Sequence, residues 1–248
     1  MPHMDQATPG GSYDQRRGQI ETYFDRTASD AWSRLTSNAP VSGIRKTVRA
    51  GRDRMRATLL DWLPDDLTGK RVLDAGCGTG AFAREAAARG AHVVAIDVAL
   101  TLVDLARDRS VEAFGAQSGG HAGTGFIEYR VGDMLDPALG HFDHVVAMDS
   151  LIHYRSADMV SMLARLAERT GTSMVFTFAP RTPALSLMHA VGRLFPRQDR
   201  APAIEPVDAD ALRQHLTAEP ALSSWTQGRS LRIDSGFYMS HAMELTRV

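Results

Sequence analysis

The chain has 248 residues, of which 44% are hydrophobic and 23% are charged, and its formal net charge is −1. This composition is that of a folded globular protein, and the length suits one large domain with additions. The nearly balanced charge weighs against a nucleic-acid partner, which a protein usually meets with a basic surplus. The only cysteine, Cys77, excludes an intramolecular disulfide bond.

No mainly apolar, uncharged run reaches the ~18 residues that a membrane-spanning helix needs. A spanning helix is therefore not expected, although attachment to a membrane surface remains compatible with the sequence. The polar first residues carry no apolar run of the kind that a secretory signal needs. We expect a cytoplasmic protein that could be peripheral at an inner or photosynthetic membrane.

The N-terminal quarter of the chain predicts a tail followed by two helices. Residues 1–14 are rich in glycine, proline and polar residues and predict a flexible tail. Apolar residues then recur at helical spacing over residues 15–35 and again over residues 44–63. We expect residues 15–64 to form a helical arm that covers the active site of a domain spanning residues 65–248.

Residues 65–248 alternate short apolar runs with helical stretches, a pattern typical of a parallel sheet with helices on both faces. The predicted strands are 71–75, 92–97, 126–131, 142–149 and 173–179, and the helices between them are 81–89, 99–114 and 157–170. A helix at 208–217 and two strands at 225–231 and 237–245 follow. The predicted fold is α/β, with a doubly wound, mostly parallel, seven-stranded sheet.

Two segments interrupt this alternation. The glycine-rich segment 115–125 precedes a strand, not a helix, so a surface connection is favoured over a phosphate-binding loop. The proline-rich segment 181–207 predicts an insertion or lid after the fifth strand. Within it, residues 184–195 form an amphipathic stretch that could line a substrate site, pack on the sheet or lie on a membrane.

A glycine-rich turn joins the first predicted strand to the first helix. Asp74 precedes three alternate glycines, Gly76, Gly78 and Gly80. Glycines allow positive φ angles and close approach of a ligand to the backbone at the edge where open α/β sheets bind ligands. A pyrophosphate would be repelled by Asp74, and the GxGxG spacing differs from the dinucleotide GxGxxG. S-adenosylmethionine (SAM), which carries a sulfonium and an ammonium and no phosphate, fits this turn.

Asp97 ends the second predicted strand, at the same edge of the sheet. A carboxylate there can accept hydrogen bonds from ribose hydroxyls, which supports a nucleoside without distinguishing between cofactors. The alternative role is to cap the helix that follows.

The segments VLDAGCGTG (72–80) and VVAID (93–97) resemble the first two motifs of class I SAM-dependent methyltransferases, and the resemblance covers about residues 65–180. GDM (132–134) resembles the adenine-binding turn of that family, with Asp133 on the exocyclic amine; turn formation is the alternative. The cofactor-binding residues that the resemblance implies are Asp74, Gly76, Cys77, Gly78, Gly80, Asp97, Val98, Asp133, Met134 and Met148.

The segment after the fourth predicted strand bears on the methyl acceptor, which the fold alone does not determine. Enzymes that methylate base amines carry Pro-Pro-Tyr-type motifs there, whereas this chain has MDSLIHY (148–154). Signatures of lysine or arginine methylation are also missing. A small-molecule acceptor is therefore favoured.

Segments outside the common motifs carry a narrower resemblance. YFDRTASDAWSRL (23–35), GIRKTVRAGR (43–52), MDSLIHY, FAPRT (178–182) and LFPR (194–197) resemble the magnesium-protoporphyrin IX O-methyltransferases of (bacterio)chlorophyll synthesis. The resemblance covers about residues 20–248. It implies methyl transfer from SAM to one propionate carboxylate of the porphyrin, giving the monomethyl ester.

The implied chemistry is simple. A propionate is already ionised at neutral pH, so no general base is needed to create the nucleophile. The protein has to align the reacting atoms and exclude water. Magnesium would arrive as part of the substrate, so we expect no metal site held by the protein.

The resemblance implies that His153 and Tyr23 position the carboxylate. His153 follows the fourth strand, at the rim that faces the methyl group; its alternative roles are a core or helix-start histidine, or an axial ligand of the substrate magnesium. Tyr23 lies on an apolar helical stripe, where core packing is the alternative.

Further candidate contacts to the substrate are basic or aromatic. Arg45 or Arg49 could hold the second propionate, although a solvated helix face is the ordinary explanation for such arginines. Tyr154 belongs to the MDSLIHY segment, and Arg181 could bind a carboxylate or cap the fifth strand. The tetrapyrrole could be handed over by the porphyrin-binding subunit of magnesium chelatase.

Two other functions remain compatible with the sequence. One is a SAM-dependent methyltransferase for another small apolar acid, phenol or amine, with Tyr23 and His153 acting as a base pair on a neutral hydroxyl. The other is a non-catalytic protein that binds SAM or a tetrapyrrole. The intact glycine turn and the histidine at the cleft rim favour an enzyme.

Overall fold

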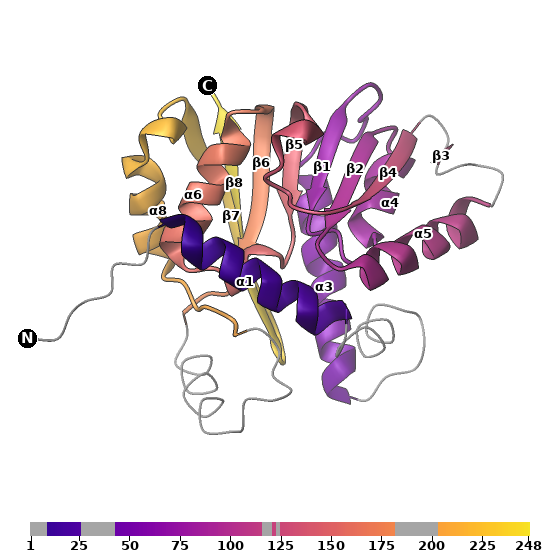
Figure 1. Ribbon diagram of the computed structural model, residues 1–248, viewed down its shortest axis with the longest axis horizontal. Coiled ribbons are helices and arrows are strands. Elements are labelled where there is room, and N and C mark those ends of the chain that lie inside the picture. The colour runs from indigo at the N-terminus through magenta and orange to yellow at the C-terminus, as the bar shows by residue number, and fades with distance from the viewer. Residues whose placement is uncertain (1–8, 26–42, 116–120, 123–124, 182–202) are drawn as a thin grey trace, which may run out of the picture.

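A computed structural model describes residues 9–25, 43–115, 121–122, 125–181 and 203–248 (Figure 1). The amphipathic stretch 184–195, most of the expected lid 181–207 and the expected helix beyond residue 25 lie outside the described residues. No helix within the described ranges is both long enough and apolar enough to cross a membrane.

The core of the fold is one sheet with the strand order β3-β4-β2-β1-β5-β6-β8-β7. Its strands are β1 (Arg71–Ala75), β2 (His92–Asp97), β3 (His121–Ala122), β4 (Gly125–Val131), β5 (Phe142–Ala147), β6 (Thr170–Phe178), β7 (Trp225–Ser235) and β8 (Tyr238–Arg247). The five strands β4-β2-β1-β5-β6 are parallel, and β8 runs antiparallel between β6 and β7. The predicted doubly wound, mostly parallel sheet is confirmed.

The eighth strand is the short β3 in the glycine-rich connection, where it pairs antiparallel with β4. Its two residues are too few for a period-2 pattern, so the sequence did not reveal it. The seven longer strands agree with the predicted number.

The helices are α1 (Pro9–Tyr23), α3 (Gly43–Asp61), α4 (Ala81–Ala88), α5 (Leu100–Phe114), α6 (Ser156–Ala167) and α8 (Ala209–Ala218). Single turns of 3-10 helix form η3 (Pro137–Leu139), η4 (Leu151–His153) and η5 (Pro220–Leu222). Asp208 caps α8, because its side chain accepts hydrogen bonds from the backbone N–H groups of Asp210 and Ala211.

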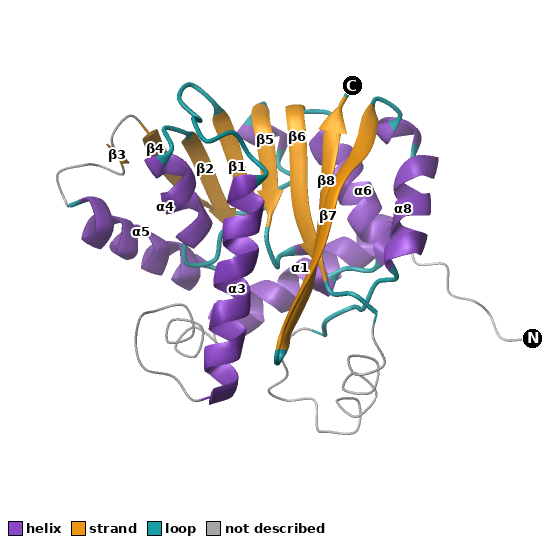
Figure 2. Ribbon diagram, turned by 180° about the vertical axis from the view of Figure 1, so that it is seen from behind, coloured by secondary structure: helices purple, strands orange, loops and turns teal. Residues whose placement is uncertain are grey.

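Helices cover the two faces of the sheet with separate apolar layers. One layer contains buried side chains of α3 and α4, and the other contains those of α6 and α8 together with Tyr13 and Ile20 of α1. Successive strand residues alternate between the layers: Val145 belongs to one and Val146 to the other. Figure 2 shows α3 running across one face, and the β7–β8 hairpin extending beyond the ends of the neighbouring strands.

The register of the central strands brings their carboxyl ends to one edge. Asp74 on β1 lies opposite Ala95 on β2 and Val146 on β5. The turns that follow these three parallel strands are therefore neighbours in space, although they are far apart in the sequence.

The predicted tail 1–14 is wrong for residues 9–14, because α1 begins at Pro9. Tyr13 is buried, its ring stacks on Tyr154, and its hydroxyl donates a 2.5 Å hydrogen bond to Asp133. Proline is tolerated in the first turn of a helix, and these tertiary contacts offset the low helix propensity of Gly10 and Gly11.

Two other boundaries differ from the prediction for local reasons. The strand expected over 142–149 ends at Ala147, because Asp149 has a left-handed φ of 54° and a 3-10 turn follows. The helix expected to reach residue 170 ends at Ala167, since Thr170 already pairs with Phe142 in the sheet.

We expect Gly125→Ala to destabilise the protein by about 1–3 kcal/mol. A Cβ at position 125 would lie 1.9 Å from the carbonyl oxygen of Ala87, so α4 would have to move away from β4. Gly171→Ala is the matched control, because its Cβ would meet nothing closer than 3.6 Å. Urea unfolding measures both variants, and equal stability of the two would contradict this account of the packing.

Candidate active site

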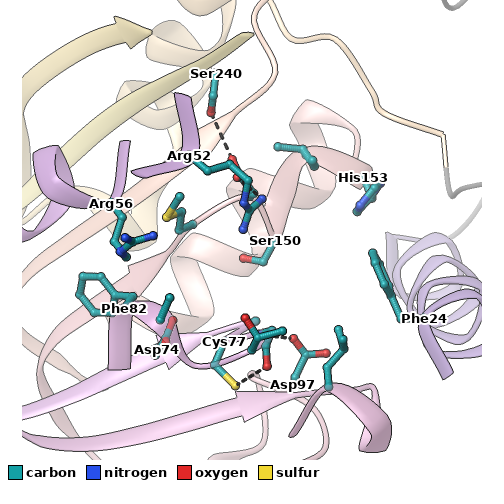
Figure 3. A pocket seen from close by; sticks show the side chains of 18 of the residues that line it. Phe24, Arg52, Arg56, Asp74, Cys77, Phe82, Asp97, Ser150, His153 and Ser240 are labelled. Atoms are coloured by element: carbon teal, nitrogen blue, oxygen red, sulfur yellow. Dashed lines mark hydrogen bonds and ion pairs between the residues drawn. The ribbon is translucent and has the colours of Figure 1, made fainter. Parts of the chain in front are cut away.

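A cavity of about 730 Å³ opens at the carboxyl edge of the sheet (Figure 3). Its walls come from the turns after β1, β2, β4 and β5, from α1 and α3, and from the start of β8. The predicted site residues in its lining are Tyr23, Arg45, Arg49, Asp74, Gly76, Cys77, Gly78, Asp97, Val98, Met134, Met148, His153 and Tyr154. Gly80, Asp133 and Arg181 lie outside the lining.

The turn after β1 requires glycine at its first position. Gly76 has a φ of 82°, and a Cβ there would lie 2.3 Å from the Cβ of Ser150, in the turn after β5. The N–H groups of Gly76 and Cys77 donate to the carbonyl of Ile96 at 2.8 and 3.0 Å. The cofactor turn therefore fits closely between the ends of two neighbouring strands.

Gly80 lies outside the cavity lining, at the N-cap of α4. It precedes α4 with a φ of 71°, and a Cβ there would lie 2.5 Å from the hydroxyl of Tyr129. Its predicted contact with the cofactor is not found in the cavity lining. The glycine instead lets α4 begin directly beneath the turn.

Asp74 is a buried acid at the bottom of the site. Its carboxyl group is 2% exposed, and its Oδ2 has no hydrogen-bond partner among the described residues. Burial, and secondarily the charge of Asp97, raise the pKa of Asp74 to about 7. A buried carboxylate without a partner is costly unless a cation approaches it, so this atom fits a cationic ligand such as SAM.

Asp97 serves the turn and the cavity together. Its Oδ2 accepts the N–H of Gly78 at 2.9 Å, and its Oδ1 accepts the N–H of Ala99 at 3.0 Å. The second contact closes a local turn just before α5, whose N-cap is Ala99 and carries no side-chain cap, so the alternative role of Asp97 as the helix cap is wrong. Each carboxylate oxygen has a second lone pair, and the side chain lines the cavity, so a role in ribose binding remains open.

Asp133 is engaged in a different interaction from the predicted one. Its Oδ1 accepts hydrogen bonds from the Tyr13 hydroxyl at 2.5 Å and from the N–H of Leu135 at 2.8 Å, and Arg17 lies 3.5 Å from Oδ2. The turn-forming alternative is thus realised, and the same carboxylate fastens α1. Its neighbour Met134 reaches the cavity instead.

Arg169 binds the backbone of the loop around Met134. The buried guanidinium of Arg169 donates to the carbonyl oxygens of Met134 and Asp136. This fixes the backbone on which the cavity residue Met134 stands.

His153 and Tyr23 line the same cavity, although they are 130 positions apart in the sequence. His153 ends η4, is 8% exposed, and its Nδ1 lies 3.3 Å from the carbonyl oxygen of Ala203. Tyr23 ends α1 and packs edge-on against Phe24, and partial burial raises the pKa of its phenol. The predicted pair is therefore brought to one cavity.

Tyr154 lines the cavity but is mainly a packing residue. It is buried and stacks on Tyr13 at a centroid distance of 5.4 Å. Burial raises the pKa of its phenol, which therefore stays protonated. Arg181 is exposed, and its backbone N–H donates to the carbonyl of Val207 at the end of the sheet. Arg181 lies outside the cavity lining, and its contact with the substrate stays a prediction.

Arginines of α3 line one wall at helical spacing. They are Arg45, Arg49, Arg52 and Arg56. Arg56 donates to Glu85 at 2.5 Å and to Asp53 at 3.0 Å, so two carboxylates already balance its charge. Arg45 and Arg49 line the cavity, where the anion-binding role predicted from sequence would place them.

The sequence prediction missed Asp149 and its partners. Asp149 has a 6% exposed side chain, and its carboxylate accepts from Arg52 at 2.6 Å, from Tyr238 at 3.0 Å and from Ser240 at 3.3 Å. These partners lie on α3 and β8, at opposite ends of the chain. The spacing of Arg52 from Arg45 and Arg49 could have indicated one of them, but no sequence pattern indicated the β8 residues.

Within the described ranges, no group of three or more histidine, cysteine, aspartate or glutamate side chains is placed to hold a metal ion. The expectation that magnesium enters with the substrate stays a prediction.

Two family descriptions match the chain. "Methyltransferase domain" matches residues 72–171, and "Magnesium-protoporphyrin IX methyltransferase C-terminus" matches residues 147–247. The first segment contains the cofactor turns, and the second contains Asp149, His153, Tyr238 and Ser240.

Individual relatives agree with these matches. A magnesium-protoporphyrin O-methyltransferase from Rhodobacter capsulatus is 47% identical over 94% of this chain and 97% of its own. One from Synechocystis is 28% identical over 92% of this chain and 95% of its own. The crystal structure of magnesium protoporphyrin IX methyltransferase from Synechocystis PCC 6803 with bound SAH superposes with a TM-score of 0.80 at 25% identity, covering 94% of this chain and all of that one.

We expect Asp74→Asn to stabilise the ligand-free protein above about pH 7 and to weaken SAM binding at least about tenfold. The pKa of Asp74 is raised from 3.8 to about 7, so the folded protein holds this proton more tightly than the unfolded chain. Stability is thus lost as pH rises between these values, and the Asn variant avoids the loss.

Calorimetric titration with SAM from about pH 8 to about pH 6 tests the same group, because protonation of Asp74 removes the attraction for a cation. The wild-type protein should lose affinity over this range, and Asp74→Asn should lose less. Identical pH profiles would show that Asp74 does not carry the charge that SAM meets.

Proposed function

The chain belongs to the magnesium-protoporphyrin O-methyltransferase family of SAM-dependent enzymes, and we propose that its acceptor is one propionate carboxylate of magnesium-protoporphyrin IX, which becomes the monomethyl ester. The observation that carries this proposal is the 47% identity to the Rhodobacter capsulatus enzyme over 94% of the chain, which includes the acceptor side of the cavity. The reaction belongs to chlorophyll or bacteriochlorophyll synthesis.

SAM supplies a methyl group made electrophilic by the sulfonium to which it is attached. The chain contributes a site of matching charge and shape. Asp74 offers a buried carboxylate to the positive charges of the ligand, and Asp97 offers acceptors at the end of β2. Gly76 and Gly78 adopt positive φ angles, which glycine tolerates, and their lack of side chains lets a ligand approach the backbone of this turn.

On the acceptor side, the protein needs to position a carboxylate and not to deprotonate it. A propionate is ionised at neutral pH. Tyr23, whose pKa is raised, remains a hydroxyl donor that can hold a carboxylate oxygen, and we assign the same positioning role to His153. The buried surroundings favour the transfer, because opposite charges cancel as the bond forms and water would stabilise the separated ions.

The apolar part of the lining suits a flat macrocycle. It includes Val48, Ile152, Ile204, Phe237 and Met239. Phe237 is 58% exposed at the tip of the β7–β8 hairpin, although it also lines the cavity. An exposed aromatic side chain at the mouth of a cavity is typical of a site that receives a large apolar ligand.

We also propose that the porphyrin is handed over by the porphyrin-binding subunit of magnesium chelatase, with the enzyme in the cytoplasm or peripheral at an inner or photosynthetic membrane. The exposed Phe237 and Ile204 beside the cavity support this proposal, because an apolar substrate is best transferred without crossing water. Faster ester formation from subunit-bound than from free porphyrin tests the hand-over, and equal rates would refute it. Flotation with anionic lipid vesicles tests the membrane contact.

The decisive experiment incubates the purified protein with SAM and magnesium-protoporphyrin IX and separates the monomethyl ester by chromatography. The rate at saturating substrates should be nearly flat from about pH 7 to about pH 9, because the acceptor is already charged. A rate that climbs steeply with pH would indicate a phenol or amine acceptor instead. Metal-free protoporphyrin is the control that shows whether the magnesium is recognised.

We expect His153→Ala to lower kcat about 10- to 100-fold while the Kd for SAM stays unchanged, because the acceptor loses its alignment. His215→Ala is the matched control, since His215 lies on α8 outside the cavity lining and contacts Ser156. An unchanged kcat in the His153 variant would remove this residue from the acceptor site.

A further inference from the structure

We propose that Arg52, held in place by the buried Asp149, binds a carboxylate group inside the cavity. This proposal rests on the function above, because both reactants of that function bring carboxylates. SAM has one at its amino-acid end, and the porphyrin has a second propionate. Arg52 thus joins the binding site as a residue that neither the cofactor motifs nor the acceptor segment indicated.

Asp149 is unusual in its backbone as well as in its contacts. Among the described residues it is the only one other than glycine with a positive φ, at 54°. Aspartate tolerates this region better than most residues, and such positions persist where the surrounding structure holds them. The holding groups are the N–H of Asp149, which donates to Thr177 Oγ1 at 2.7 Å, and the side-chain donors to its carboxylate. A turn constrained in this way is typical of a functional site.

The carboxylate of Asp149 depends only in part on Arg52. Its Oδ1 also accepts from Tyr238 at 3.0 Å, from Ser240 at 3.3 Å and from Thr177 at 3.3 Å. Three hydroxyl groups thus share the anion with Arg52, and the ion pair holds the guanidinium in place. The ion pairs of Arg56 differ from this one. Its partners Glu85 and Asp53 each accept a side-chain hydrogen bond from Arg56 itself.

Packing fixes the backbone that carries Arg52. Its neighbour Gly51 faces the ring of Tyr238, and a Cβ at position 51 would lie 2.5 Å from Tyr238 Cδ1. The hydroxyl of the same tyrosine donates to Asp149. Helix α3, strand β8 and the turn after β5 therefore contact one another around Tyr238. These contacts restrict the position of the backbone and side chain of Arg52.

The position of Arg52 places its charge where the two reactants meet. Asp149 is followed by Ser150, whose side chain packs on Gly76 in the cofactor turn, and His153 lies one turn further along. Figure 3 shows the guanidinium of Arg52 directed toward Ser150 inside the cavity. The lining as a whole has five arginines and five carboxylates, so it provides partners for a ligand that bears both signs of charge.

The test compares Arg52→Gln with Arg54→Gln. Arg54 is an exposed residue of the same helix and lies outside the cavity lining, so its variant controls for loss of one positive charge. S-adenosylhomocysteine (SAH) and 5′-methylthioadenosine differ in the amino-acid end that bears the carboxylate. If Arg52 binds that group, Arg52→Gln should weaken SAH about 10- to 100-fold and leave methylthioadenosine unchanged.

The porphyrin provides the second arm. If Arg52 binds the other propionate, the variant should raise the KM for magnesium-protoporphyrin IX by a similar factor and leave SAH binding unchanged. Either pattern supports a carboxylate site. The proposal is overturned if neither ligand is affected, or if SAH and methylthioadenosine weaken equally while the KM for the porphyrin stays constant.

Asp149→Asn tests the positioning role. Asparagine has the same shape and tolerates the same φ, so the variant should fold, which circular dichroism checks. It should weaken the same ligand as Arg52→Gln, and the double variant should be no weaker than Arg52→Gln alone. Additive losses would show that Asp149 does not act through Arg52. If the wild-type protein binds SAH but forms no ester, the proposed function is refuted. The comparison of SAH with methylthioadenosine would then still test whether Arg52 binds a carboxylate.

Discussion

The close approach of two backbone turns, one after β1 and one after β5, is the constraint on which the site depends. The Cβ position of Gly76 lies within 2.3 Å of the Ser150 side chain, so the cofactor turn and the acceptor turn share a wall. Asp74 is buried beneath it, Asp149 is strained beside it, and His153 follows one turn later.

The charges around this wall are arranged in two different ways. Asp74 is buried with an unpartnered oxygen, which leaves the site prepared for a cation from outside. Asp149 is buried with four side-chain donors, so it is satisfied from within and orients the group beside it. A carboxylate thus acts as a ligand in one case and as an anchor in the other, and the difference lies entirely in the partners supplied by neighbouring elements.

Local pattern predicted most of the sheet. The limits of β1 and β2 agree with those expected, because each is a mainly apolar, buried run that ends at or one residue beyond an aspartate, Asp97 or Asp74. The start of α1 was not predictable, since Gly10 and Gly11 oppose a helix and only the distant partners of Tyr13 explain it. The bond of Asp133 to Tyr13 and the hydrogen bonds of Asp149 were not predicted for the same reason. Each depends on residues more than eighty positions away, and a single sequence gives no sign of those pairings.

The contacts between α3 and the β7–β8 hairpin determine which segments of this chain could be exchanged with those of a relative. Ser235 donates to the carbonyl of Thr47, Arg229 donates to that of Trp62, and Tyr238 fits against Gly51. The general and the porphyrin-specific family matches overlap over residues 147–171, and the start of the second match at residue 147 does not separate independent pieces. A chimera joined there would pair a foreign hairpin with the resident helix, whereas exchange of residues 43–61 together with 225–247 would keep these contacts matched. These two segments form one structural unit, although the cofactor-binding residues lie between them in the sequence.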